Sequence, residues 1–155
     1  MAPNLSVQEN LEFIAGIYGF SEQESRKKAG EIMEEFGFDE IRTSRAKTLS
    51  GGWQRKLSIA MALITDPKVL YLDEPTLGLD VLARRELWKV IRSLKGKVTV
   101  ILTTHYMEEA EELSDHIAIM MKGRLMAVGT LAELQAKTGK ESLEDIFVSI
   151  VEEAE

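Results

Sequence analysis

The chain has 155 residues, 45% hydrophobic and 29% charged, so it is large enough to bury a core and its composition excludes a disordered tail. Acidic residues outnumber Lys and Arg by 26 to 19, and the net charge of -7 gives no reason to expect a nucleic-acid partner. The absence of cysteine excludes disulfides, thiolate metal sites and a cysteine nucleophile, and it favours the cytoplasm.

Two amphipathic helices are predicted first. Ser6 and Ser21 each stand three residues before a glutamate, the capping-box spacing in which the hydroxyl and the carboxylate each satisfy a free backbone N–H. Gly19 and Gly37 are expected to end these helices, which we expect to pack on each other. The apolar face of the first helix is predicted to consist of Leu11, Ile14, Ala15 and Tyr18. A loop with basic residues follows, at Arg42, Arg45 and Lys47.

The rest of the chain alternates helices with strands. A helix over 54–64 is predicted to end at Asp66-Pro67. Apolar runs predict strands at 69–72, 98–102 and 117–121, and the first two are expected to be buried on both faces. Further helices are predicted at 87–94 and 106–113, from Thr130 and from Ser142. This alternation indicates an α/β fold with a parallel sheet.

Two adjacent carboxylates, Asp73 and Glu74, follow the first strand. Ligands of α/β sheets bind at the carboxyl ends of strands. Because side chains alternate along a strand, the two carboxylates are expected to point in different directions, one toward a metal and one toward a water. The alternative is that they only end the strand and cap the next element, and this motif alone does not decide between the two.

A second candidate is the turn Ser50-Gly51-Gly52, which opens the helix over 54–64. Free N–H groups, the positive end of the helix dipole and the lack of Cβ atoms suit a phosphate. A plain Ser N-cap with two turn glycines is the alternative.

The third candidate is His105, which follows the second strand directly and could contact a phosphate or orient a water. Taken alone, a surface histidine in a loop is the better interpretation. His116 is interpreted as structural.

Four motifs occur in one order, namely Leu49-Ser50-Gly51-Gly52, Leu72-Asp73-Glu74-Pro75, Leu77-Gly78-Leu79-Asp80 and Thr104-His105. Together they resemble the signature motif, Walker B strand, D-loop and switch histidine of the ATP-binding subunit of an ABC transporter. The resemblance runs from about Pro3 to the C-terminal helix. The segments 103–110 and 142–147 look most like bacterial exporters of drugs and other small compounds.

The resemblance implies a partial P-loop NTPase (RecA-like) parallel sheet preceded by an α-helical subdomain. The helical subdomain would span 1–66 and end in the signature-motif helix. The C-terminal half of the catalytic α/β core would span 67–130, and C-terminal helices would span 131–155.

The resemblance also implies roles for individual residues, with ATP and Mg²⁺ as the bound groups. Asp73 would hold Mg²⁺ through water, and Glu74 would polarise the attacking water as general base. His105 would contact the γ-phosphate, and Asp80 would link two active sites across a dimer. The residues that would bind ATP held mainly by the opposite subunit are Ser50, Gly51, Gly52 and Gln54.

The sequence departs from this family in lacking the phosphate loop, Gly-x-x-x-x-Gly-Lys-Ser/Thr. In the family this loop lies well beyond the 48 residues that precede Leu49. The chain therefore resembles the C-terminal portion of a subunit, and an engineered truncation, a split gene and a wrongly assigned start codon all fit. In such folds a strand lies between those predicted at 98–104 and 117–121, so we expect the isolated chain to rearrange, swap segments or aggregate. Trp53 and Val81 are smaller departures that touch no assigned role.

The expected partners follow from the same resemblance. No apolar stretch approaches the roughly 20 residues that span a bilayer, and the N-terminus carries no signal peptide. We expect a second nucleotide-binding subunit and a transmembrane permease subunit, no nucleic acid, and a cytoplasmic location at the inner face of the cell membrane. The alternatives are a non-enzymatic regulatory or interaction module, and an ABC-type ATPase of DNA repair or translation. The last is disfavoured because no long coiled-coil or linker insertion is visible.

Overall fold

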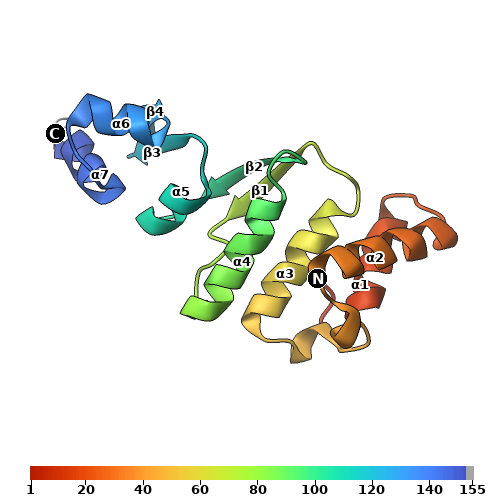
Figure 1. The fold of residues 1–155 in the computed structure, drawn as a ribbon. Coiled ribbons are helices and arrows are strands. Elements are labelled where there is room, and N and C mark those ends of the chain that lie inside the picture. The colour runs from red at the N-terminus through yellow and green to blue at the C-terminus, as the bar shows by residue number, and fades with distance from the viewer. Residues whose placement is uncertain (153–155) are drawn as a thin grey trace. The chain divides into compact units, whose positions relative to one another are not determined.

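The computed structural model describes residues 1–152, which fall into two compact units, Met1–Thr103 and a second that begins at Thr104. The first unit (Figure 1) contains α1 (Val7–Ile17), α2 (Glu22–Phe36), two 3-10 turns (Asp39–Ile41 and Ala46–Thr48), α3 (Gly51–Leu63), β1 (Val69–Asp73), α4 (Val81–Ser93) and β2 (Thr99–Thr103). The second contains α5 (Met107–Leu113), β3 (Ile117–Met121), β4 (Arg124–Gly129), α6 (Leu131–Thr138) and α7 (Leu143–Glu152).

Helices α1 and α2 pack on each other and begin as predicted. Both capping boxes are present, at Ser6 with Glu9 and at Ser21 with Glu24. Gly37 ends α2 at φ 68°, a left-handed conformation that glycine adopts without strain.

The predicted apolar face of α1 was wrong at Tyr18. That side chain is 65% exposed, whereas Val7, Leu11 and Ala15, at a spacing of four residues, are fully buried. The helix ends at Ile17, and Tyr18 is its C-cap with φ -83° and ψ 7°, so it no longer follows the helical period.

A fully buried asparagine, Asn10, ties the N-terminal segment to α1. Its Nδ2 donates to the carbonyls of Ala2, Leu5 and Ser6, and its Oδ1 accepts from the Ala2 N–H at 2.7 Å. Backbone hydrogen bonds then join this segment to the loop 42–47, so the stretch before α1 has a fixed path.

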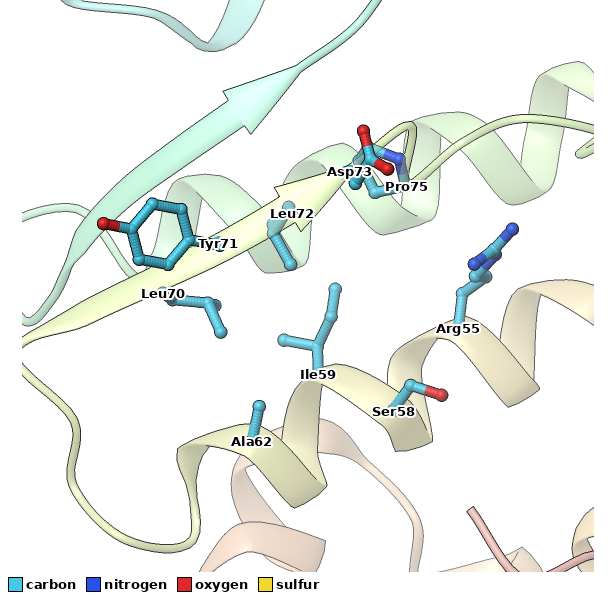
Figure 2. A pocket seen from close by; sticks show the side chains of 9 residues that line it. All are labelled: Arg55, Ser58, Ile59, Ala62, Leu70, Tyr71, Leu72, Asp73 and Pro75. Atoms are coloured by element: carbon cyan, nitrogen blue, oxygen red, sulfur yellow. The ribbon is translucent and has the colours of Figure 1, made fainter.

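The predicted parallel pairing is confirmed for β1 and β2, whose register runs from Val69 opposite Thr99 to Asp73 opposite Thr103. Burial on both faces was wrong. Leu70 and Leu72 are buried and point toward α3 (Figure 2), but Tyr71 is 73% exposed and its register partner Ile101 is 44% exposed. The strand alternates because only one side of this sheet is packed against helices of the first unit.

The third predicted strand exists as β3, but it pairs antiparallel with β4 instead of joining the parallel pair. The turn between them places Lys122 and Gly123 at positive φ, which is typical of a tight hairpin. The second unit has its own core, contributed by one face of the hairpin, α6 and α7: Ile117, Ile119, Ala127, Leu134, Leu143, Ile146 and Ile150.

Candidate functional site

Asp73 is the last residue of β1 and its side chain is exposed. The parallel register places it opposite Thr103 at the end of β2. The Thr103 hydroxyl donates a hydrogen bond to Oδ1 of Asp73. The sequence predicted where Asp73 stands, but it did not identify Thr103. A polar residue at the end of each of two adjacent parallel strands was the available signal.

Glu74 turns the chain sharply away from β1. Its φ of 46° is unusual for a residue with a side chain. Its N–H donates to the Thr103 carbonyl at 3.0 Å, and its own carbonyl accepts from the Leu77 N–H at 3.2 Å. Glu74 is half-buried whereas Asp73 is exposed, so the two neighbouring carboxylates have different surroundings.

The turn Ser50-Gly51-Gly52 is the N-terminus of α3, and Ser50 and Gly51 are exposed. Ser50 is the N-cap, but its side chain caps none of the described backbone N–H groups. The first N–H groups of α3 therefore lack a side-chain cap, and the positive end of the helix faces solvent. The side-chain amide of Gln54 donates to the Leu49 carbonyl at 2.9 Å and so holds the chain just before this turn.

The two glycines let α3 approach the segment after β1. A Cβ on Gly52 would lie 3.1 Å from Cβ of Ala83, and one on Gly51 would lie 3.5 Å from a methyl carbon of Leu79. The first distance is tighter than ordinary contact, so α3 and α4 pack closely because residue 52 has no side chain.

Asp80 is the N-cap of α4. Its Oδ1 accepts from the N–H groups of Leu82 at 2.9 Å and Ala83 at 3.0 Å. Within this chain Asp80 therefore fixes the start of α4 and the path of 77–79.

Two cavities of the first unit are bordered by residues of these segments. The one in Figure 2 has a volume of about 190 Å³ and lies between α3 and β1, with Arg55 and Asp73 toward one end and Leu70 and Ala62 toward the other. A second, of about 310 Å³, is bordered by Gly51, Gln54 and 77–79. Arg55 and Ser58 border both cavities, so Gly51, the segment 77–79 and Asp73 share one surface of this unit.

His105 lies in the second unit and is exposed. The Tyr106 N–H donates to the Thr104 hydroxyl at 3.0 Å, and the His105 and Tyr106 rings lie 4.2 Å apart. The first unit thus holds Ser50, Gly51, Gly52, Gln54, Asp73, Glu74 and Asp80, and the second holds His105.

The donor set for a metal is small. The described residues contain no group of three or more His, Asp or Glu side chains able to hold a metal ion. An exposed carboxylate nevertheless suits Mg²⁺, because this ion keeps several waters and is bound through one or two carboxylates and substrate phosphates. Asp73 meets that requirement.

Comparison with known proteins identifies the family to which the chain belongs. The family described as "ABC transporter" matches residues 1–77, which include the turn Ser50-Gly51-Gly52 and the Asp73-Glu74 pair. A solved structure described as "Structure of ATP binding subunit of ABC transporter" matches with a TM-score of 0.78 and 30% identity, covering 97% of this chain and 64% of that one. The chain belongs to the ABC transporter ATP-binding family.

Two relatives in this family have names that refer to different compounds. The daunorubicin resistance ATP-binding protein DrrA3 of Streptomyces coeruleorubidus is 41% identical over 144 residues, 92% of this chain and 46% of that protein. The phospholipid-transporting ATPase ABCA3 of Rattus norvegicus is 45% identical over 136 residues, 88% of this chain and 8% of that protein. The chain therefore spans less than half the length of either relative.

ABC ATP-binding proteins bind ATP, usually with Mg²⁺, and are generally ATP hydrolases that work with transmembrane components. Within residues 1–152, none of the helices combines the length and apolar character of a membrane span.

Proposed function

We propose that this chain forms the signature-motif and catalytic-carboxylate portion of an ABC transporter subunit whose ATP hydrolysis drives transport across a membrane. The observation that carries the proposal is the exposed N-terminus of α3, which lacks a side-chain cap and lies beside the D-loop on the same surface as Asp73. A helix N-terminus without a side-chain cap provides N–H donors and positive potential for a phosphate.

The roles proposed for individual residues are those that the resemblance to the family implies. Ser50, Gly51 and Gly52 would donate hydrogen bonds to the γ-phosphate of ATP held mainly by a second subunit, and Gln54 would keep that turn in shape. Asp73 would hold Mg²⁺ through water. Glu74 would accept a proton from the attacking water as general base, and His105 would donate to the γ-phosphate.

The metal contributes charge neutralisation and orientation of the phosphates when it is bound. The chain would hold Asp73 at the end of β1 and orient Glu74 through the left-handed backbone conformation of Glu74 itself, with φ 46°. Asp80 would shape the D-loop at the boundary between two subunits.

The proposed partners are a second nucleotide-binding subunit and a transmembrane permease, which would keep the protein at the cytoplasmic face of the membrane. The proposed cargo is a drug or another small compound, or a phospholipid, because relatives named for daunorubicin resistance and for phospholipid transport both match.

Phosphate release tests the proposal. The chain alone is expected to show no ATP turnover above background, because its sequence contains no phosphate loop. Mixed with a polypeptide that carries the phosphate loop and preceding strands of the DrrA3 relative, it should hydrolyse ATP. Glu74→Gln should lower that turnover by about 100-fold or more, the usual contribution of a general base. Glu86→Gln, an exposed glutamate of α4, is the matched control. Equal turnover by the two variants would contradict the role of Glu74.

A further inference from the structure

None of the roles proposed above uses the side-chain hydrogen bond between Thr103 and Asp73 in the first unit. The Thr103 hydroxyl donates to Oδ1 of Asp73 across the β1–β2 register. We infer that Thr103 is a positioning residue that selects the orientation in which the Asp73 carboxylate meets a divalent cation. This inference rests on the proposed function, because it concerns the group that would hold Mg²⁺.

The exposure of Asp73 gives the bond its importance. An exposed carboxylate rotates broadly about its terminal torsion, so many of its orientations do not suit a given ligand. A hydroxyl bond to a carboxylate is charge-assisted and strong enough to favour one orientation. A carboxylate has about four acceptor positions, so one bond on Oδ1 leaves others for metal-bound water.

Thr103 suits this task for two reasons. Its β-branched side chain has restricted χ1 freedom in a strand, so the hydroxyl stays over Asp73. Its backbone carbonyl accepts from the Glu74 N–H at 3.0 Å, so the same residue contacts both carboxylate-bearing residues. A side-chain substitution removes the first contact and keeps the second, which makes the two separable.

The other end of β2 supplies a matched control. Thr99 is exposed and lies on the same side of the sheet as Thr103, but its register partner is Val69, which carries no acceptor in its side chain. Thr99→Val therefore makes the same chemical change on the same strand, away from Asp73. Valine has high strand propensity, so neither Thr→Val change should disrupt β2.

The test compares Thr103→Val, Thr103→Ser and Thr99→Val in the whole chain. The first measurement is the ¹³Cγ resonance of Asp73 without nucleotide. Thr103→Val should move this resonance, whereas Thr103→Ser and Thr99→Val should leave it close to its original position. An unmoved resonance in Thr103→Val would overturn the inference, whatever the metal data show.

The second measurement is Mn²⁺ binding in the presence of ATP, followed by electron paramagnetic resonance. Thr103→Val should weaken Mn²⁺ binding by about tenfold, the usual size of a hydrogen bond to a charged group, and Thr103→Ser should restore it to within about twofold. Equal affinities for Thr103→Val and Thr103→Ser would also overturn the inference. Asp73→Asn tests the proposed function separately: if it binds Mn²⁺ as the parent does, the metal role of Asp73 fails.

Discussion

Gly51 and Gly52 are adjacent in α3, but a Cβ would meet different surroundings at the two positions. Gly51→Ala adds a methyl group at ordinary contact distance at the exposed first residue of α3 and should change stability by about 0.5 kcal/mol or less. Gly52→Ala places a methyl group 3.1 Å from Cβ of Ala83, and overpacking of this kind costs about 1–3 kcal/mol. We therefore expect Gly52→Ala to be the less stable variant in urea unfolding. Equal midpoints would show that α3 and α4 are not held this closely.

Asn10 is the buried polar residue that organises the N-terminal segment of the first unit. Asn10→Ala removes four hydrogen bonds and should lower the free energy of unfolding by about 1–3 kcal/mol. Asn4→Ala, which removes only an exposed bond to Lys47, should cost about 0.5 kcal/mol or less. Urea unfolding measures the change in the free energy of unfolding for both variants. An equal effect of the two substitutions would contradict the role of Asn10 in holding the N-terminal segment.

The site residues differ in how far the sequence could predict them. The place of Asp73 at a strand end was predictable because a short apolar run followed by an acid indicates where a strand stops, and ligands bind at that end of a parallel sheet. Thr103 was not, because its contact with Asp73 depends on the pairing register of two strands that lie 30 residues apart in the chain. The capping role of Asp80 was missed, although an Asp just before a helix is a local signal for it.

Among the elements, helix starts were the most predictable features because a capping box is local. The boxes at Ser6, Ser21 and Thr130 are all present. Strand partners were less predictable, since neither the exposed face of β1 and β2 nor the antiparallel pairing of β3 follows from a run of apolar residues.

The capping boxes also predict a pH dependence. The side-chain hydrogen bond from Ser21 is the main cause that lowers the pKa of Glu24, and the backbone N–H of Ser6 is the main cause for Glu9. Because these carboxyl pKa values are lower in the folded state, their contribution to stability is complete above the ordinary value of 4.5 and disappears as the pH falls through the lowered folded value. Helix content followed by circular dichroism should therefore begin to decrease below about pH 4.5.

Glu24→Gln is the matched variant for this prediction, because glutamine keeps the capping hydrogen bond without a titrating group. Its pH dependence should be weaker than that of the parent chain. If helix content fell more steeply with decreasing pH in Glu24→Gln than in the parent chain, the assigned capping role of the Glu24 carboxylate would be contradicted.

For the whole molecule, one side of the β1–β2 sheet leaves large apolar side chains exposed in the first unit. Val69, Tyr71 and Ile101 lie on this side, and each of the two strands pairs with only one other among the described residues. Apolar surface beside open strand edges favours association. We expect the isolated chain to sediment with a concentration-dependent coefficient, and Tyr71→Lys with Ile101→Lys to reduce this dependence. A concentration-independent monomer would contradict the expectation.

We propose that this chain contributes the turn Ser50-Gly51-Gly52 and the Asp73-Glu74 pair to the two ATP sites of a dimer. The most direct test is an amide NMR titration of the whole chain with MgATP and, separately, MgADP. MgATP should shift the amide signals of Gly51, Gly52, Asp73 and Glu74 at weak affinity, and MgADP, which has no γ-phosphate, should shift those of the two glycines much less. Shifts confined to other residues, or equal responses of Gly51 and Gly52 to the two nucleotides, would contradict the claim.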